Sequence, residues 1–338
     1  MVWIWISMLL LVFCFLLLSL SAETKITIFF GKKTSTAERI KYIGTICGAI
    51  IILGTLYENS NTNKLALEQN TLTKKSHLDN RFLEANNLLN SESISANIAG
   101  VYALHQIAIE SSKTKENIGY VPVIKNILCN VIKENSRLEK QNVTERWVVL
   151  LPLETIDIDT KEIDDNPNRE LFQAIIDVLF KKEESIIYSH HSTSLNNCEL
   201  QNCDFTNATL INVDFVKSNL QNTNFSRARL QDVKLWGASL QDVKFHYSDL
   251  TNVHCYSAHI EGGDFFCANL TNVDFDAANM YRAWFRGAVL KDISFSSAFL
   301  NNADFSDVEL DSTSFEGGIF YNEYTNFKGT IYENIEKK

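Results

Sequence analysis

The sequence lacks the short motifs that mark most enzyme active sites. It contains no glycine-rich nucleotide loop, no zinc-protease helix, no nucleophile elbow and no Cys/His set at metal-binding spacing. The nearest thing to a ligand pair is His190 and His191, but adjacent side chains point apart in an extended chain, which favours a solvated turn. We therefore predict no catalytic residue, no metal ligand and no cofactor.

The sequence also lacks paired cysteines and an excess of positive charge. Its seven cysteines include no CxxC pair, so buried free thiols are the favoured interpretation, and these suit a reducing compartment. The formal net charge is -10, which argues against a nucleic-acid-binding protein of the basic-patch type. We expect no direct binding of nucleic acid.

Charge is absent from two stretches near the start. Val2 to Leu20 is apolar and long enough to cross a bilayer at ~1.5 Å per residue, although a cleaved signal peptide ending near Ser21 is an alternative. Tyr42 to Tyr57 is slightly shorter and has a tyrosine at each end. These runs predict an integral membrane protein with two transmembrane helices.

Orientation in that membrane is a balance of opposing signals. Basic residues between the two runs, such as Lys32 and Lys33, favour a loop in the cytoplasm. Lys74, Lys75 and the unpaired cysteines favour a cytoplasmic body, which we adopt as the prediction.

The carboxy-terminal half has a period of five residues. From Leu195 to Phe320 every fifth residue is Leu or Phe, except Cys255, Ile260 and Met280, and a small or β-branched residue stands two positions before each. Neither a helix nor a strand keeps such residues on one face, so the chain must turn a corner every five residues. Repeats of this kind bury a core only by stacking.

A second period of twenty residues gives the size of one coil. Phe recurs at that spacing from Phe205 to Phe305, and Leu recurs from Leu210 to Leu310. Four corners per coil would stack Phe on Phe and Leu on Leu. His254 and His259 would then diverge around a corner, which speaks against joint metal binding.

Steps such as Cys203-Asp204-Phe205 and Ala303-Asp304-Phe305 resemble the pentapeptide-repeat family. The resemblance implies a right-handed, four-sided β-helix over residues 190–322. After Phe320 the count of five slips and Thr325 to Phe327 begins a new register, so residues 323–338 are predicted to form a cap and tail, with Tyr321, Tyr324 and Phe327 covering the last coil. Polar residues before each central position, such as Asp264, belong to the family pattern, so solvated corners explain them without acid/base catalysis.

Residues 59–189 are predicted to be helical. Apolar residues at helical spacing follow Ile94 and again Tyr120, which suggests a HEAT-like hairpin, and Leu171 to Leu179 predicts a further helix covering the open first coil. Together with Ala37-Glu38-Arg39 and Arg81 to Ala85, the Ile98 to Ala108 piece resembles the amino-terminal region of membrane-anchored bacterial pentapeptide-repeat proteins. The fold class predicted is therefore α+β multidomain: two transmembrane helices in residues 1–58, this helical region, and the β-helix.

Outward aromatic residues give the only candidate site. Residues twenty apart should be vertical neighbours, and large aromatics at normally polar positions are typical of interaction surfaces. The candidate partner-binding residues are His246, Tyr247, Phe266, Trp284 and Arg286 on one side, and Trp236 and Tyr256 on another. A covering by the chain's own helices or tail is the alternative.

Two functions remain open at this point. The first is a non-enzymatic scaffold, anchored in a bacterial inner membrane, that presents its repeat surface to an unknown protein partner, with self-association possible. The second follows from the resemblance, since some pentapeptide proteins confer quinolone resistance by mimicking DNA to topoisomerases. Residues 190–338 carry 19 acidic and 11 basic residues, a net of -8, which permits such mimicry.

Overall fold

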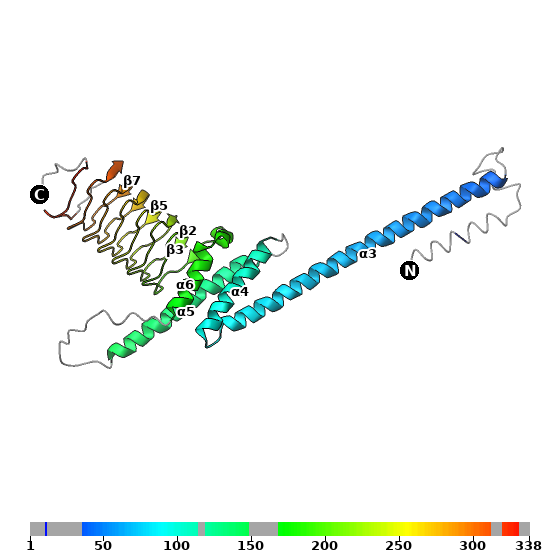
Figure 1. Cartoon of the computed structure of the whole chain (residues 1–338), viewed down its shortest axis with the longest axis horizontal. Coiled ribbons are helices and arrows are strands. Elements are labelled where there is room, and N and C mark those ends of the chain that lie inside the picture. Colours follow the sequence, from blue (N-terminus) through cyan, green and yellow to red (C-terminus); the bar gives the residue numbers. More distant parts are fainter. Residues whose placement is uncertain (1–10, 12–35, 114–118, 149–167, 312–319, 331–338) are drawn as a thin grey trace. The chain divides into compact units, whose positions relative to one another are not determined.

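The computed structural model describes residues 11, 36–113, 119–148, 168–311 and 320–330. These fall into two compact units, residues 1–77 and 78–338. The helix α3 (Thr36–Leu89) is 54 residues long and belongs to both units (Figure 1). The predicted domain boundaries stay predictions.

The prediction of two transmembrane helices is wrong for the second run. Tyr42 to Tyr57 lies within α3, and no described helix is both long and apolar enough to cross a membrane. The physical reason is length: the run ends at Lys41 and Glu58, so at ~1.5 Å per residue its uncharged part falls short of the ~30 Å hydrocarbon core. The first run lies outside the described residues, apart from Leu11.

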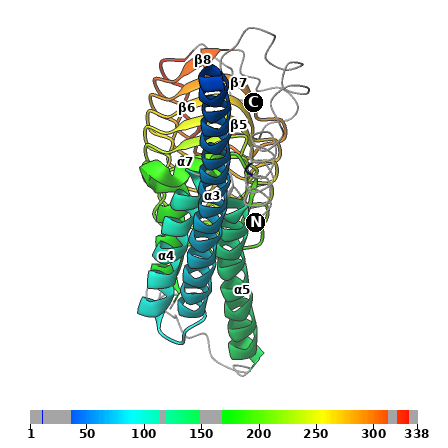
Figure 2. The ribbon, with the colours of Figure 1, turned by 90° about the vertical axis from the view of Figure 1, so that its right-hand side faces the viewer.

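The second unit begins with a helical region, as predicted. The carboxy-terminal end of α3 packs with α4 (Ile94–Ser112) and α5 (Tyr120–Val148), and α4 and α5 lie side by side (Figure 2). The side chain of Ser93 caps α4 by accepting a hydrogen bond from the backbone N–H of Ala96. A Cβ on Gly100 would lie 2.7 Å from the backbone nitrogen of Leu89, so this glycine allows α4 to cross α3 closely.

The strands of the repeat region are short and parallel. They form a six-stranded sheet in the order β2-β4-β5-β6-β7-β8 and a two-stranded pair, β1-β3, which together make a solenoid of about six turns (Figure 1). Leu230 pairs with Leu250 and Leu270 with Leu290, so one coil is twenty residues, as predicted. The strands are β1 (Thr193–Ser194), β2 (Thr209–Ile211), β3 (Val213–Asp214), β4 (Arg229–Gln231), β5 (Asp249–His254), β6 (Asn269–Asp274), β7 (Val289–Ser294) and β8 (Glu309–Asp311).

The core of the solenoid is a column of stacked phenylalanine rings. The centroids of Phe205 and Phe225 are 4.6 Å apart and those of Phe245 and Phe265 are 5.0 Å apart, with nearly parallel rings. These separations match the ~4.8 Å between neighbouring strands, so the backbone pairing and the ring stacking reinforce each other. The predicted Phe stack is confirmed, and the Leu series pairs on another side of the coil.

Each corner is made by one residue in the left-handed region. From Asn197 to Asp307, the second residue after every central position has positive φ, between 52° and 60° wherever it is not glycine. Asn, Asp and Gly adopt this conformation at least cost, which explains why they dominate there. The corner turns the chain so that the next small and large residues both point inward.

A short helical segment covers the first coil, in the place where the sequence predicts a cap. It contains α6 (Arg169–Ile176), the π-helix η1 (Asp177–Lys181), the 3-10 helix η2 (Glu183–Ser185) and α7 (Ile186–Ser189). Phe180 extends the ring column, 6.1 Å from Phe205. The side-chain amide of Gln173 donates to the backbone oxygen of Asp204 at 2.8 Å and accepts from its nitrogen at 2.9 Å, so it takes the place of a missing strand.

The far end departs from the predicted register. Phe299 pairs with Phe320, one residue more than a full coil, so Phe320 faces outward and is not a central residue. The partly buried Tyr321 packs against the core in its place. Phe327 stacks on Phe305 at 5.3 Å, which confirms the new register predicted for Thr325 to Phe327, whereas Tyr324 is exposed and covers nothing.

Candidate interaction surface

The polar residues that precede the central positions have a structural task. The carboxylate of Asp264 accepts the backbone N–H of Phe266, and Asp274 and Asn224 each accept the N–H two residues later in the same way. These bonds close the turns at the corners where they occur. The interpretation as corner residues therefore holds, and the carboxylates do not converge on a common point for acid/base chemistry.

The histidine pairs do not form metal sites. His190 and His191 are exposed in the turn that precedes β1. His254 packs edge-on against Trp236, whereas His259 lies 3.6 Å from Glu261 on the next side of the coil. In the described part of the chain no three His, Cys, Asp or Glu residues group closely enough to hold a metal ion.

Three of the predicted site residues form one contiguous surface, which we call the aromatic patch: His246, Tyr247 and Phe266. The ring of Phe266 lies 5.6 Å from that of Tyr247 and 6.3 Å from that of His246, edge-on in both cases. Tyr247 is 54% exposed and Phe266 36%. Nε2 of His246 lies 2.6 Å from Oδ2 of Asp264, so the imidazole stands between this carboxylate and the phenyl ring of Phe266.

Trp284 and Arg286 adjoin the aromatic patch without completing a ring cluster. The backbone of Trp284 bridges to Asp264 on the coil before it, and its indole is 57% exposed. No ring contact between Trp284 and Phe266 occurs in the described structure. Arg286 stands one coil beyond Phe266, and its Nε lies 3.8 Å from the carboxylate of Asp307, with both side chains largely exposed.

The second predicted group lies on a different side of the coil. Trp236 and Tyr256 are neighbours through the backbone, because the N–H of Gly237 donates to the oxygen of Tyr256. Their rings make no contact in the described structure, and Trp236 packs edge-on against His254 at 6.3 Å. The predicted vertical ring stack is therefore absent.

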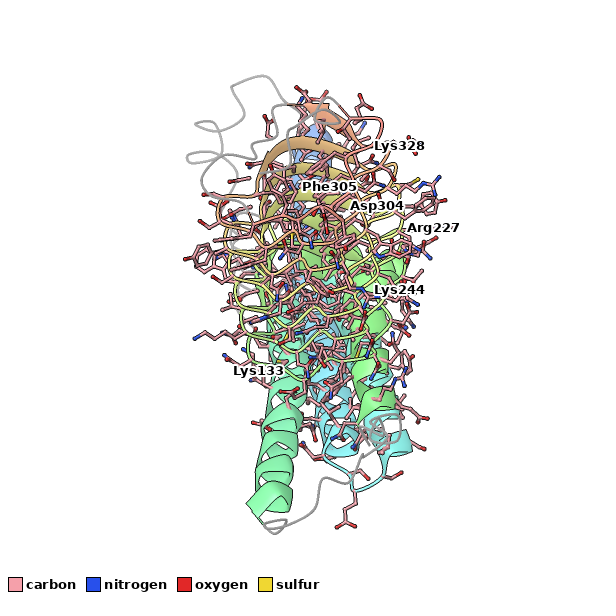
Figure 3. The ribbon with its side chains drawn as sticks, turned by 90° about the vertical axis from the view of Figure 1, so that its left-hand side faces the viewer. Lys133, Arg227, Lys244, Asp304, Phe305 and Lys328 are labelled. Atoms are coloured by element: carbon pink, nitrogen blue, oxygen red, sulfur yellow. The ribbon has the colours of Figure 1, made fainter. Side chains whose placement is uncertain are left out.

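The structure also shows a hollow that the sequence reading does not single out. It lies at the corner before the aromatic patch, and the middle coil contributes Gly262, which has no side chain, to its lining. Asp264 and Trp284, which line the hollow, belong to one column of bridged residues that also contains Lys244 and Asp304. The labels of Lys244 and Asp304 in Figure 3 locate this column. We call the hollow the corner groove; its lining residues are Gln241, Asp242, Glu261, Gly262, Asp264, Tyr281, Arg282 and Trp284.

Comparison with known families agrees with the geometry of the coils. A family profile described as "Pentapeptide repeat region" matches residues 189–265, and one described as "Pentapeptide repeats (8 copies)" matches residues 254–292 and 288–322. Residues 189–322 are a pentapeptide-repeat domain. No curated protein matches the chain.

Solved structures similar to the chain include proteins described as pentapeptide-repeat proteins, among them HetL and an Arabidopsis thaliana protein. HetL from the cyanobacterium Nostoc is 20% identical over 41% of this chain and 70% of its own, with a TM-score of 0.25. The plasmid-mediated fluoroquinolone resistance protein QnrB1 is 16% identical over 36% of this chain and 79% of its own, with a TM-score of 0.19. A protein of the Arabidopsis thaliana thylakoid lumen is 29% identical over 33% and 68%, with a TM-score of 0.15.

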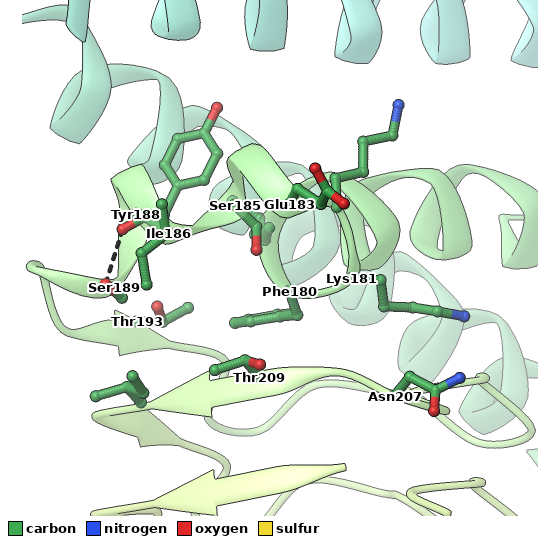
Figure 4. Close-up of a pocket in the computed structure, with 13 residues that line it drawn as sticks. Phe180, Lys181, Glu183, Ser185, Ile186, Tyr188, Ser189, Thr193, Asn207 and Thr209 are labelled. Atoms are coloured by element: carbon green, nitrogen blue, oxygen red, sulfur yellow. Dashed lines mark hydrogen bonds between the residues drawn. The ribbon is translucent and has the colours of Figure 1, made fainter. Parts of the chain in front are cut away.

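A second hollow lies between the pentapeptide-repeat domain and its cap. Phe180, Thr193 and Thr209 face this space, while the ring of Tyr188 points away from it toward the helices (Figure 4). Lys181 lines it as well, but its ammonium group is 2.9 Å from the carboxylate of Asp204 and is therefore already paired. We interpret this hollow as the seam between cap and first coil.

Beside this seam is a buried polar cluster that fastens the helices to the cap. Nζ of Lys125 donates to the backbone oxygens of Tyr188 and His191, where α7 ends, and Nδ1 of His105 lies 3.2 Å from the hydroxyl of Tyr188. Burial lowers the pKa of Lys125 to about 8 and, together with nearby Lys182, lowers the pKa of His105 to about 4. Every partner in this cluster belongs to the fold, so its role is structural.

Proposed function

We propose that the pentapeptide-repeat domain is a non-enzymatic interaction scaffold and that the aromatic patch is where a protein partner binds. The observation that carries the proposal is the ring contact of Tyr247 with Phe266 on a solvent-exposed face. Exposed aromatics of this kind are enriched in the central residues of interfaces. A rigid coil also presents them without much loss of conformational entropy on binding.

Two further features support a scaffold. Among the described residues, stacked and buried apolar side chains fill the core of the domain. The corner carboxylates are engaged by backbone N–H groups, which leaves them poorly placed for proton transfer. The coils therefore offer a rigid outer surface, and this outer surface is the part of the domain available to bind a partner.

The experiment is affinity capture from cross-linked source cells with the full-length chain. A Phe266→Ala, Trp284→Ala variant removes one ring of the aromatic patch and the exposed indole that adjoins it, and a Trp236→Ala, Tyr256→Ala variant removes two exposed rings from another side as a matched control. We expect at least one partner to fall about tenfold with the first variant and to be retained by the second. Identical capture by all three proteins would refute the proposal.

A DNA mimic is the second candidate, favoured by the net charge of -8 over residues 190–338. The DNA-mimic candidate is weakened by basic residues that interrupt the acidic surface of the early coils: Arg227, Arg229, Lys234 and Lys244. Mimicry would make partner binding depend on acidic residues along the whole tube. Neutralising two exposed acids away from the aromatic patch, as in Asp292→Asn with Glu309→Gln, should then lower capture as much as losing Phe266; the scaffold proposal expects no change.

A further inference from the structure

The corner groove is a built feature of the coil, because it depends on one missing side chain. Gly262 and Gly263 follow each other at a corner where the coils before and after carry Asp242 and Arg282. Gly262 has φ +67°, and a Cβ there would lie 2.5 Å from Oδ1 of Asp242. The glycine therefore opens the space and lets Asp242 line it.

Two hydrogen-bond acceptors of the residues that line the groove have no donor. Oε2 of Glu261 and Oε1 of Gln241 are buried and unpartnered in the described structure. Oε1 of Glu261 accepts from Asn279, which holds this carboxylate in place beside the groove. Buried acceptors without a donor are costly, so a bound group that supplies N–H donors would be stabilised there.

The chain's own arginine does not satisfy these acceptors. Arg282 lines the groove, yet it is exposed and its guanidinium group makes no hydrogen bond or ion pair within the described residues. Three carboxylates, those of Asp242, Glu261 and Asp264, leave the lining acidic despite this one basic residue. An anionic ligand is thereby disfavoured, and the absence of a metal-holding group among the described residues argues against a cation held by carboxylates alone.

Two exposed aromatic rings complete the lining. Trp284 is 57% exposed and Tyr281 42%, so both offer a ring face or edge to a ligand. A guanidinium group is planar, carries five N–H donors and stacks on aromatic rings, whereas an ammonium group is a compact point charge with three donors. Carboxylate oxygens that lack donors, next to an exposed indole ring, therefore fit a guanidinium group better than an ammonium group.

We infer that the corner groove binds an arginine side chain of the partner protein. This inference rests on the proposed scaffold function and names the chemistry of its partner: a segment with an arginine that enters the groove, next to apolar residues that cover the aromatic patch. His246 links the two surfaces, since its ring contacts Phe266 and its Nε2 lies beside Asp264. Charge attraction would steer the segment, and the aromatics would hold it.

The test uses three synthetic peptide libraries against the purified full-length chain. Each peptide has four uncharged residues on either side of a fixed arginine, lysine or citrulline, with both ends capped. Citrulline keeps the shape of arginine without its charge. We expect the arginine library to bind about tenfold more tightly than the other two, by fluorescence anisotropy.

Variants locate that binding in the groove. Glu261→Gln keeps Oε1 for Asn279 and removes the charge, so it should weaken arginine binding about tenfold and leave citrulline binding unchanged. Asp292→Asn, an exposed acid on β7, is the matched control and should change neither. Matching unfolding curves for all variants exclude a folding defect.

Equal binding of arginine and citrulline, equal binding of arginine and lysine, or an unaffected Glu261→Gln variant would each overturn the arginine inference. Absence of binding by all three libraries would also overturn it. The proposed function is judged separately: partner capture that depends on Phe266 and Trp284 would keep the aromatic patch as an interaction surface even when the arginine inference fails.

Discussion

Phe245 stands in the middle of the ring column, fully covered by its neighbours. It stacks 5.1 Å from Phe225 and 5.0 Å from Phe265, and it is 1% exposed. Replacing it by Ala should lower the free energy of unfolding by about 3–5 kcal/mol, because the flanking rings are held by strand pairing and cannot collapse into the cavity. Chemical denaturation of the full chain measures the loss.

The matched control for Phe245 is Phe266, the same side chain pointing outward one coil later. Phe266→Ala should lower the free energy of unfolding by less than about 1 kcal/mol, since the ring is already partly solvated. Equal losses for the two variants would show that the column does not carry the stability of the solenoid.

His105 makes the helical region sensitive to acid. Its pKa is lowered from 6.5 to about 4 in the folded chain, so between these values the unfolded chain binds more protons. The neutral imidazole contributes its full share of the free energy of unfolding above pH 6.5. This share, up to about 3 kcal/mol, is lost as the pH falls toward 4. His105→Leu should flatten this part of the stability curve, measured by denaturation at several pH values.

An exposed histidine provides the comparison. His190→Gln replaces an exposed side chain in the turn before β1 and should leave the slope between pH 4 and 6.5 unchanged. A slope that persists in His105→Leu would mean that other groups cause the acid loss. His105→Leu also removes the contact with Tyr188, which lowers the free energy of unfolding equally at every pH. The change of that free energy with pH is therefore the measurement that isolates the charge of His105.

At the scale of the elements, the cap depends on one side chain that imitates a strand. Gln173→Ala leaves the backbone N–H of Asp204 without its partner and leaves the backbone oxygen of Asp204 only the 3.4 Å contact with Nζ of Lys181, so it should lower the free energy of unfolding by about 1–3 kcal/mol. Gln221→Ala, at a corner of the second coil, is the control and should change it by less than about 0.5 kcal/mol. If Gln173→Ala behaves like the control, Phe180 and the apolar contacts alone hold the cap.

The stacking of the coils could be predicted from the sequence, because two periods act together. Five residues define a corner, and the recurrence of Phe and Leu at twenty fixes which corners lie above one another. The end of the solenoid could not, because Phe320 and Tyr321 are adjacent aromatics and a count of five favours the first. Pairing with Phe299 places Phe320 outside, so the true register differs by one residue.

The candidate site was predictable in part. Outward aromatics such as Tyr247 and Phe266 are visible in the pattern, since polar residues usually fill those positions. The orientation of the rings cannot be predicted from the pattern: Trp236 packs against His254 and not against Tyr256. The corner groove has a signal in Gly262-Gly263, the place where a corner loses its side chain, but its meaning depends on the coils above and below.

On the scale of the whole molecule, each coil contacts mainly the coil before and the coil after it. The strand pairs all follow this rule from β1 to β8, so stability should be nearly a sum over coils and their interfaces. In such a molecule some coils carry the binding surface, and other coils only add length to the solenoid. Removing a whole coil therefore tests both properties.

Deleting residues 211–230 removes twenty residues and joins Leu210 to Gln231, so Phe205 would stack on Phe245 as it now does on Phe225. We expect this variant to unfold cooperatively and to keep partner capture. Deleting residues 211–225 keeps the five-residue period but sets the Phe column against the Leu column, and it should unfold at a clearly lower denaturant concentration.

A second deletion of equal length separates folding from binding. Removing residues 251–270 also preserves the twenty-residue register, but it takes away Glu261, Gly262 and Asp264 of the corner groove, and Phe266, the ring that both other members of the aromatic patch contact. This variant should fold as well as the one lacking residues 211–230 and lose capture of the partner. Retained capture would place the interaction elsewhere on the tube, because the two variants share their length and coil count and differ in which coil is gone.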